Sequence, residues 1–236
     1  MNAMQNVSET PTPARRYPMP FTRIELAVMS IASDRLVVLL GKRAEAPHKG
    51  KWALPGGVLR IDLDSDLEAA AQRVATERLG VELPFLRQLV ATGSARRDPR
   101  APWALSIAYR ALLPLGAIDP QAGKRIEALK WVPADDAAAD ANIAFDHSSL
   151  VRLSVAVTRD EIGKLDLPFD YLPEKFTLVE LQACCEAILG HALDKSSFRR
   201  RIDDRRLVEP VPGEKLTGGA FRPAQMYRPR RSASGK

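Results

Sequence analysis

Residues 50–81 read GKWALPGGVLRIDLDSDLEAAAQRVATERLGV, and this stretch predicts a strand, a double-glycine turn, a loop and one strong helix. Ser65, followed three residues later by Glu68, matches a capping box at the start of that helix. Gly80 stands where a left-handed C-terminal cap falls. Between these signals, apolar residues recur at helical spacing and predict one buried face, made of Leu67, Ala70, Ala71, Val74, Ala75 and Leu79.

The same stretch resembles the Nudix box, the signature of hydrolases that cleave nucleoside diphosphates linked to another group. The family pattern ends in Arg-Glu-apolar-any-Glu-Glu-any-Gly-apolar. This chain keeps part of that pattern, at Arg73, Glu77, Gly80 and Val81. It departs from the pattern at three acidic positions, which here are Ser65, Val74 and Arg78. Its loop between the glycines and the helix is also longer than the pattern allows. The resemblance therefore implies a Nudix fold with an altered active site.

A Nudix hydrolase holds Mg²⁺ with carboxylates at helical positions i, i+3 and i+4, because that spacing puts three oxygen ligands on one face. The same positions here are Val74, Glu77 and Arg78, so one carboxylate remains and a cation stands where the metal would bind. Packing alone explains Val74, which continues the apolar face. We therefore predict no catalytic residues, no metal site, no cofactor and no hydrolysis.

A binding pocket is nevertheless expected beside this helix. Gly56 and Gly57 permit a close approach of the backbone to a phosphate, and Arg78 can neutralise a diphosphate through paired hydrogen bonds. The other nearby cations either bind the ligand or are solvated, and the tryptophan either stacks on a ligand or packs beneath the glycine turn. The predicted ligand-binding residues are Arg43, Lys51, Trp52, Gly56, Gly57, Arg60 and Arg78.

The composition is typical of a soluble globular protein with one large or two smaller domains: 236 residues, 45% hydrophobic and 27% charged. No apolar run approaches the roughly 18 residues of a membrane span, so no membrane partner is expected. Residues 1–20 lack a signal-peptide pattern and are interpreted as a disordered arm. Cys184 and Cys185 are adjacent on a predicted helix, which disfavours a disulfide between them and fits a protein of the reducing cytoplasm.

The whole chain is assigned to the α+β class, with a Nudix-like α/β/α sandwich and mixed sheet at residues 21–162. Asp146 is the expected N-cap of the helix that closes this domain. Prolines 168 and 173 mark a domain boundary, which we place at about residues 162–172. Alternating or buried apolar runs predict strands at 21–30, 35–40, 86–92, 103–113 and 128–132, and helical spacing predicts the closing helix at 145–158.

Residues 163–228 predict a winged helix-turn-helix domain. Thr177 with Glu180 forms a second capping box, and the helix that it opens ends at Gly190. Asp194 can cap a second, basic helix. The remaining predicted elements are this basic helix, at 195–205, and a pair of strands, at 207–210 and 225–228. Helix, short turn, basic helix and hairpin is the order of a winged helix-turn-helix.

The positive charge is concentrated at the C-terminus. Residues 195–236 contain 12 Lys and Arg against 4 Asp and Glu, a net charge of +8, whereas the whole chain carries +6. The first 194 residues therefore carry a net charge of −2. This split is typical of a nucleic-acid-binding domain joined to a neutral or acidic one. Residues 229–236 are interpreted as a disordered basic tail.

The basic helix is the predicted recognition helix. Residues in its N-terminal half, Ser196, Ser197 and Arg200, are expected to reach base edges, while the other cations meet phosphates. Phe198 and Ile202, four residues apart, are expected to face the domain core. A solvated basic face is the alternative interpretation. The predicted DNA-binding residues are Lys195, Ser196, Ser197, Arg199, Arg200 and Arg201 in the helix and Arg222 and Arg228 in the wing.

Five motifs together resemble the Nudix-related transcriptional regulators of NAD metabolism, the NrtR family. They are LPGGV (54–58), AFDH (144–147), PEKFTL (173–178), DKSSFRR (194–200) and RPAQMYR (222–228). The resemblance spans about residues 20–228. It implies a bacterial repressor of NAD biosynthesis or salvage genes and an effector that is ADP-ribose or a related NAD-derived nucleotide. It also implies a homodimer on a palindromic double-stranded DNA operator.

Two alternatives to a ligand-controlled repressor stay open. The first is a Nudix hydrolase of the ADP-ribose pyrophosphatase type with an accessory nucleic-acid-binding domain, which the missing carboxylates disfavour. The second is an interaction protein in which the Nudix fold serves only as a scaffold.

Overall fold

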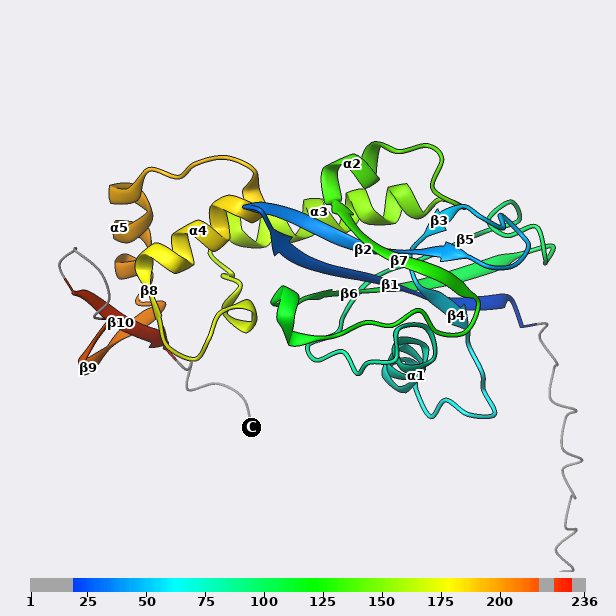
Figure 1. The fold of residues 1–236 in the computed structure, drawn as a ribbon, viewed down its shortest axis with the longest axis horizontal. Coiled ribbons are helices and arrows are strands. Elements are labelled where there is room, and N and C mark those ends of the chain that lie inside the picture. The colour runs from blue at the N-terminus through cyan, green and yellow to red at the C-terminus, as the bar shows by residue number, and fades with distance from the viewer. Residues whose placement is uncertain (1–18, 217–222, 231–236) are drawn as a thin grey trace, which may run out of the picture.

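The computed structural model describes residues 19–216 and 223–230 (Figure 1). The predicted arm at residues 1–20 and the predicted tail at 229–236 lie mostly outside the described residues, and Arg222 lies wholly outside them. None of the described helices is long and apolar enough to span a membrane.

A seven-stranded mixed sheet forms the N-terminal domain, as predicted. Its strands are β1 (Phe21–Ala32), β2 (Arg35–Arg43), β3 (Trp52–Ala53), β4 (Gly56–Val58), β5 (Arg87–Ser94), β6 (Ala104–Leu112) and β7 (Ile126–Pro133). The strand order is β3-β2-β1-β6-β5, with β4 paired to β1 and β7 paired to β2. Only the β1–β6 pair among these is parallel. The central strand β1 is buried because it has a neighbour on both edges and helices on both faces.

Helices cover both faces of the sheet, which confirms the predicted α/β/α sandwich (Figure 1). Helix α1 (Leu67–Leu79) packs on one face, and α2 (Ala134–Ala139) and α3 (His147–Gly163) pack on the other. Alternate residues of β1 point to opposite faces, so Leu26 and Val28 join the core under α1 while Ala27 and Met29 join the core under α3.

Helix α1 begins one residue later than the capping box predicts. Asp66, not Ser65, is the N-cap, and its carboxylate accepts a 2.7 Å hydrogen bond from the Ala69 backbone N–H. The charged carboxylate is a stronger acceptor at a helix N-terminus than a neutral hydroxyl, and the Ser65 hydroxyl instead donates to Asp66 at 3.0 Å. The predicted C-cap is confirmed, because Gly80 is left-handed with φ of 68°.

The N-cap of α3 also differs from its prediction. Asp146 occupies the N-cap position, but its side chain does not bond to the first turn of the helix. The carboxylate pairs instead with the guanidinium of Arg97 from the loop between β5 and β6. A sequence pattern of local caps could not indicate this competing long-range ion pair.

The C-terminal domain has the predicted order of helix, turn, helix and hairpin. Its elements are β8 (Phe176–Thr177), α4 (Leu178–Leu189), α5 (Lys195–Arg205), β9 (Val208–Leu216) and β10 (Ala224–Pro229). The capping box of Thr177 and Glu180 is present, Gly190 is left-handed, and Asp194 caps α5 by accepting a 2.8 Å bond from Ser197. Strand β8 was not predicted, because two residues form a strand only through their pairing with β10.

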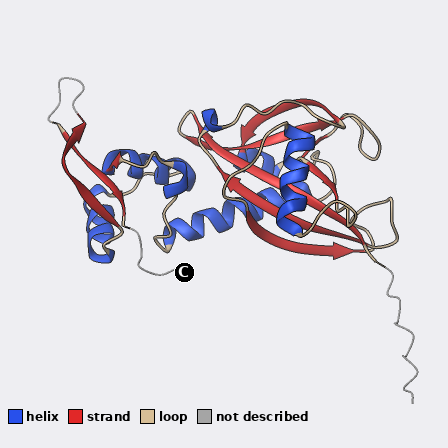
Figure 2. Ribbon diagram, turned by 90° about the horizontal axis from the view of Figure 1, so that it is seen from below, coloured by secondary structure: helices blue, strands red, loops and turns tan. Residues whose placement is uncertain are grey.

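The two domains share one hydrophobic core. The cluster under α3 continues into the C-terminal domain, where it includes Phe176, Leu181, Phe198 and Ile202. Helix α4 packs against α3 and also contacts β1 and β2. The helices and hairpin of the C-terminal domain lie at one end of the molecule (Figure 2), whereas α1 lies against the sheet of the N-terminal domain (Figure 1). Helix α3 therefore runs from the N-terminal sheet to the C-terminal domain.

Candidate functional site

A basic cleft of about 390 Å³ lies beside α1. Its volume falls within the range of small-molecule sites, which is roughly 300–1,000 Å³. Five of its lining residues are cations and one is a carboxylate; the lining is Val58, Arg60, Arg73, Glu77, Arg78, Lys124 and Arg125. The cleft therefore has the electrostatic character of an anion site.

A second depression adjoins this cleft, because Arg78 and Arg125 line both. Arg43 and Gly56 also line the second depression, together with Arg23 and Arg100. The two hollows form one basic site that follows the glycine turn. They bring together four residues predicted to bind ligand: Arg43, Gly56, Arg60 and Arg78.

The guanidinium of Arg78 is held by two backbone carbonyls. Its Nε atom donates to the Gly56 oxygen at 2.8 Å, and a terminal nitrogen donates to the Lys124 oxygen at 2.7 Å. The residue is 8% exposed, and burial lowers the pKa of the guanidinium from its ordinary value. Arg78 thus joins α1 to β4 and to the loop before β7, and its remaining N–H groups border the cleft.

Neither of the other altered positions of the Nudix pattern supplies a metal ligand. Val74 is fully buried in the core under α1, and Ser65 lies in the exposed loop before the helix. Among the described residues, no group of three His, Cys, Asp or Glu side chains could hold a metal ion. Glu77 faces Arg73 at 3.5 Å instead.

Both glycines of the turn are required by close packing. A Cβ atom at Gly57 would lie 2.7 Å from Val74 Cγ2, and one at Gly56 would lie 1.9 Å from Glu25 Oε2. The double glycine therefore lets β4 lie directly against α1 and β1. The sequence predicted a close approach to a ligand phosphate, whereas the contacts present here are with the protein itself.

A buried charge cluster lies beneath Gly56. Glu25 is 1% exposed and forms a 2.7 Å ion pair with Arg23. Burial raises the pKa of Glu25, but Arg23 and His147 outweigh burial and lower the pKa to about 2. His147 Nδ1 accepts a hydrogen bond from the Leu54 N–H at 3.0 Å, which directs Nε2 toward Glu25 Oε2 at 3.7 Å.

Phe145 forms an aromatic wall between this cluster and the surface. The guanidinium of Arg43 lies 5.0 Å from the centre of its ring, and the His48 ring lies edge-on at 4.6 Å. Arg43 is fixed by a 2.7 Å bond from Nε to the Pro47 oxygen. The AFDH motif thus places an aromatic face and a histidine at the N-terminus of α3, next to the basic site.

Three predicted ligand residues line neither hollow, namely Lys51, Trp52 and Gly57. Lys51 is exposed and lines neither hollow. Trp52 packs against the core under α3, and Lys130 Nζ lies 4.1 Å from its ring centre. Arg60 does line the cleft, where it pairs with Asp62 at 2.6 Å. Packing therefore accounts for Trp52.

Sequence reasoning missed Lys124 and Arg125. The loop that carries them folds onto the C-terminal end of α1, where the Gly123 and Lys124 N–H groups donate to the carbonyls of Arg78 and Glu77 at 3.0 and 2.9 Å. A Cβ atom at Gly123 would lie 2.3 Å from the Glu77 oxygen. The Gly-Lys-Arg run is a local signal, but only the fold shows that it meets the helix.

Helix α5 presents one polar face opposite its buried side. Phe198 and Ile202 are buried, and Arg200 is exposed near the middle of the opposite face. Ser196 precedes Arg200 on this face, while Asp203 and Asp204 follow it. Because phosphates repel carboxylates, the N-terminal half of the face is the part suited to contact DNA.

The other predicted DNA-binding residues are placed differently. Arg201 donates a 2.9 Å bond to the Gly163 carbonyl at the end of α3, and Arg228 pairs with Glu209 across the β9–β10 hairpin at 2.6 Å. Arg199 is half-buried. Lys195 and Ser197 are exposed at the start of α5.

Both halves of the chain match known protein families. Residues 23–153 match the model of the NUDIX domain, and residues 168–228 match that of the NrtR DNA-binding winged helix domain. The ADPR responsive transcriptional repressor NtrR of Acinetobacter baylyi is 37% identical over 212 residues, which cover 90% of this chain and 83% of that protein.

Two solved structures from Shewanella oneidensis are also similar. NrtR complexed with a 27mer DNA is 29% identical with a TM-score of 0.69, and the match covers 89% of this chain and 93% of that one. The NUDIX domain of NrtR complexed with ADP ribose is 28% identical with a TM-score of 0.54, covering 60% of this chain and 90% of that one.

Proposed function

The chain belongs to the NrtR family, in which a NUDIX domain is joined to a DNA-binding winged helix domain, and we propose that it is a transcriptional repressor controlled by ADP-ribose or a related NAD-derived nucleotide. One observation carries the proposal. The domain that holds the basic site shares its hydrophobic core with a winged helix domain.

The basic cleft binds the diphosphate of the nucleotide. Its cations neutralise the phosphate charge without a metal, because guanidinium and ammonium groups form charge-assisted hydrogen bonds to phosphate oxygens. Arg78 borders both hollows and provides a fixed positive charge in place of Mg²⁺. The cations assigned to this role are Arg43, Arg60, Arg73, Arg78, Lys124 and Arg125.

The bound nucleotide is not hydrolysed. Hydrolysis at a Nudix site needs a metal ion that holds the attacking water and the diphosphate. The side chains of Val74 and Arg78 provide no carboxylate to bind that metal. The lone Glu77 faces Arg73, and a single carboxylate in that setting does not recruit a divalent cation. The site is a sensor that keeps the recognition chemistry of its family and lacks the catalyst.

Helix α5 enters the major groove of DNA with its N-terminal half. Arg200, at the centre of the exposed face, reads a base edge, while Lys195 and the serines contact phosphates or bases. A homodimer places two such helices about one helical turn apart, roughly 34–36 Å, on a palindromic operator. The target genes are those of NAD biosynthesis or salvage, in keeping with the NAD-derived effector.

Two experiments test these assignments. The full chain is used to select DNA from a random double-stranded library, and the selected sequences should be palindromes with half-sites about one helical turn apart. Calorimetric titration with ADP-ribose should show saturable binding in the presence of EDTA. Selected DNA without symmetry would contradict the proposed homodimer, and absence of ADP-ribose binding would contradict ADP-ribose as the effector.

A further inference from the structure

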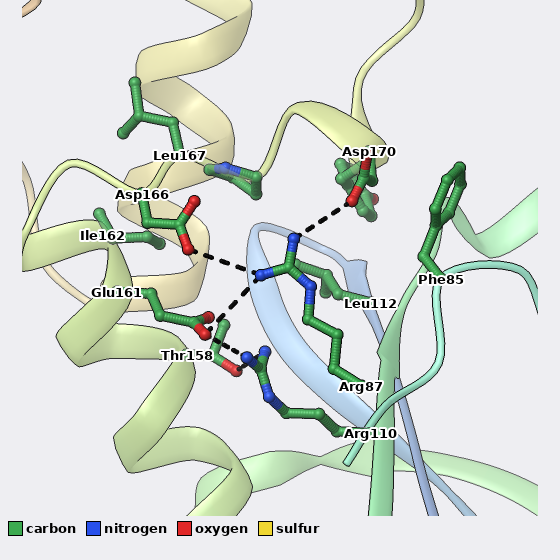
Figure 3. Close-up of a pocket in the computed structure, with 12 residues that line it drawn as sticks. Phe85, Arg87, Arg110, Leu112, Thr158, Glu161, Ile162, Asp166, Leu167 and Asp170 are labelled. Carbon is green, nitrogen blue, oxygen red and sulfur yellow. Dashed lines mark hydrogen bonds and ion pairs between the residues drawn. The ribbon is translucent and has the colours of Figure 1, made fainter. Parts of the chain in front are cut away.

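A small cavity of about 40 Å³ lies where the chain leaves α3 for the C-terminal domain (Figure 3). One wall belongs to strands β5 and β6 of the N-terminal sheet, and the other belongs to the end of α3 and to residues 164–172. This segment, which includes the short helix Phe169–Tyr171, is called the linker here. The cavity is therefore the point at which the two domains are joined.

Arg87, at the start of β5, faces three carboxylates across this cavity (Figure 3). Its guanidinium lies 3.8 Å from Glu161 on α3, and 3.5 Å from both Asp166 and Asp170 on the linker. Charge-assisted hydrogen bonds are usually about 2.7–2.9 Å long, so these three contacts are long. Because the side chain is 50% exposed, Arg87 can exchange partners at little cost.

The linker is also held by apolar packing and by backbone hydrogen bonds, such as the 2.9 Å bond from the Asp166 N–H to the Glu161 oxygen. Leu167 is buried in the core under α3, and Tyr171 and Leu172 pack against that core. Burial of apolar surface holds the linker close to the sheet, but it is not directional. Arg87 joins two linker carboxylates, Asp166 and Asp170, to the N-terminal sheet and thus adds a directional contact.

Arg87 is also connected to the basic cleft through a short, fixed segment. The last turn of α1 carries Arg78, and only the segment from Gly80 to Leu86 separates that helix from Arg87. Gln72 on α1 bonds to Leu83 in both directions, at 2.6 Å to its oxygen and at 3.1 Å from its N–H. The segment is thereby fastened to α1 and must follow any displacement of that helix.

We propose that Arg87 is a positioning residue that transmits nucleotide occupancy of the cleft to the linker, and so sets the placement of the winged helix domain. The inference rests on the proposed function, since it assumes an effector in the cleft and DNA as the output. A small shift of α1 on ligand binding moves Arg87 between Asp166 and Asp170, since Glu161 is already paired with Arg110. The linker carboxylates follow, and the recognition helices of a dimer change their spacing.

The test compares Arg87→Ala with Arg35→Ala in the full chain. Arg35 forms a similarly exposed, long pair with Asp136 at 3.6 Å on the same domain and serves as the matched control. Two quantities are measured for each protein: the Kd for ADP-ribose, and the Kd for library-selected DNA with and without saturating ADP-ribose. We expect Arg87→Ala to bind ADP-ribose with the wild-type Kd. The ratio of its DNA Kd with ADP-ribose to its DNA Kd without ADP-ribose should move at least fivefold toward one.

An unchanged ratio in Arg87→Ala, equal to that of Arg35→Ala, would overturn the inference while leaving the proposed function intact. Failure of the proposed function would look different, because the wild type itself would not bind ADP-ribose or respond to it. A charge exchange adds a second test. The single variants Arg87→Asp and Asp170→Arg should each reduce the change in DNA Kd that ADP-ribose causes, and the double variant Arg87→Asp/Asp170→Arg should restore part of that change. Absence of restoration would exclude the ion pair as the positioning contact.

Discussion

The Nε atom of Arg78 lies 2.8 Å from the carbonyl oxygen of Gly56, so the residue that replaces an acidic position of the hydrolase pattern ties the box helix to the glycine turn. This contact gives Arg78 two roles. It stabilises the site, and it holds a buried positive charge at a position that is acidic in the Nudix pattern.

The first role predicts that Arg78→Ala lowers the free energy of unfolding by about 2–4 kcal/mol, because two carbonyls lose a charged hydrogen-bond donor. Urea denaturation at neutral pH measures the change. Arg60→Ala is the matched control, since Arg60 lines the same cleft but is about half exposed and pairs only with Asp62. It should leave the unfolding midpoint unchanged and weaken ADP-ribose binding. Equal stability of both variants with the wild type would contradict the structural role.

The second role predicts that ADP-ribose binds without a divalent cation. Calorimetric titrations with EDTA and with millimolar Mg²⁺ should give Kd values within a factor of two, because Arg78 already supplies a buried positive charge beside the cleft. Neither condition should release AMP during prolonged incubation. A tenfold gain in affinity with Mg²⁺, or steady release of AMP, would instead favour the hydrolase alternative.

The buried pair of Glu25 and Arg23 predicts a pH-dependent stability. The pKa of Glu25 is lowered to about 2, so its stabilising contribution is complete above its ordinary value of 4.5 and is lost as the pH falls toward 2. Glu25→Gln leaves Arg23 buried without a counter-charge and should cost about 3–5 kcal/mol at pH 7. Its stability should also fall less steeply than that of the wild type between pH 5 and pH 2.

Denaturant titrations across that pH range check the prediction. Glu127→Gln is a control, because Glu127 forms an exposed pair with Lys42 at 3.0 Å and should follow the wild-type profile. Parallel profiles for Glu25→Gln and the wild type would mean that Glu25 is not the titrating group.

The exposed face of α5 predicts a difference between two arginines. Arg200→Ala should weaken binding to library-selected DNA by about 1–3 kcal/mol and reduce discrimination against scrambled DNA, because a base contact is lost. Arg205 is exposed in the last turn of α5, away from the N-terminal half proposed to enter the groove, so Arg205→Ala should weaken binding to both DNAs by the same smaller factor. Fluorescence anisotropy measures the four affinities. If both variants kept full discrimination, Arg200 would be a solvated cation.

Local signals in the sequence predicted much of this fold. Gly80, Gly190 and the capping box of Thr177 and Glu180 depend on residues within one helical turn, and each is present as predicted. Asp66 displaced Ser65 as N-cap because two adjacent residues offered the same local signal. Strand β8 escaped prediction, since pairing alone makes it a strand.

The candidate site was harder to predict because its residues meet only in the fold. Lys124 reaches the cleft through a loop that folds back onto α1, and Glu25 is a buried charge in a strand whose neighbours are mostly apolar. Arg201 has the sequence context of a phosphate contact, yet it bonds to Gly163. Contacts between residues far apart in the sequence determine where each of these side chains lies. The periodicity of apolar residues carries no information about such contacts.

Control of DNA binding by the nucleotide site is tested most directly by a single measurement. The Kd of the full chain for its selected palindromic DNA is measured by gel shift without ligand and at saturating ADP-ribose. Because couplings between sites are typically about 1–3 kcal/mol, we expect the Kd to change at least fivefold. An unchanged Kd, at a concentration where calorimetry shows the nucleotide site to be full, would contradict it.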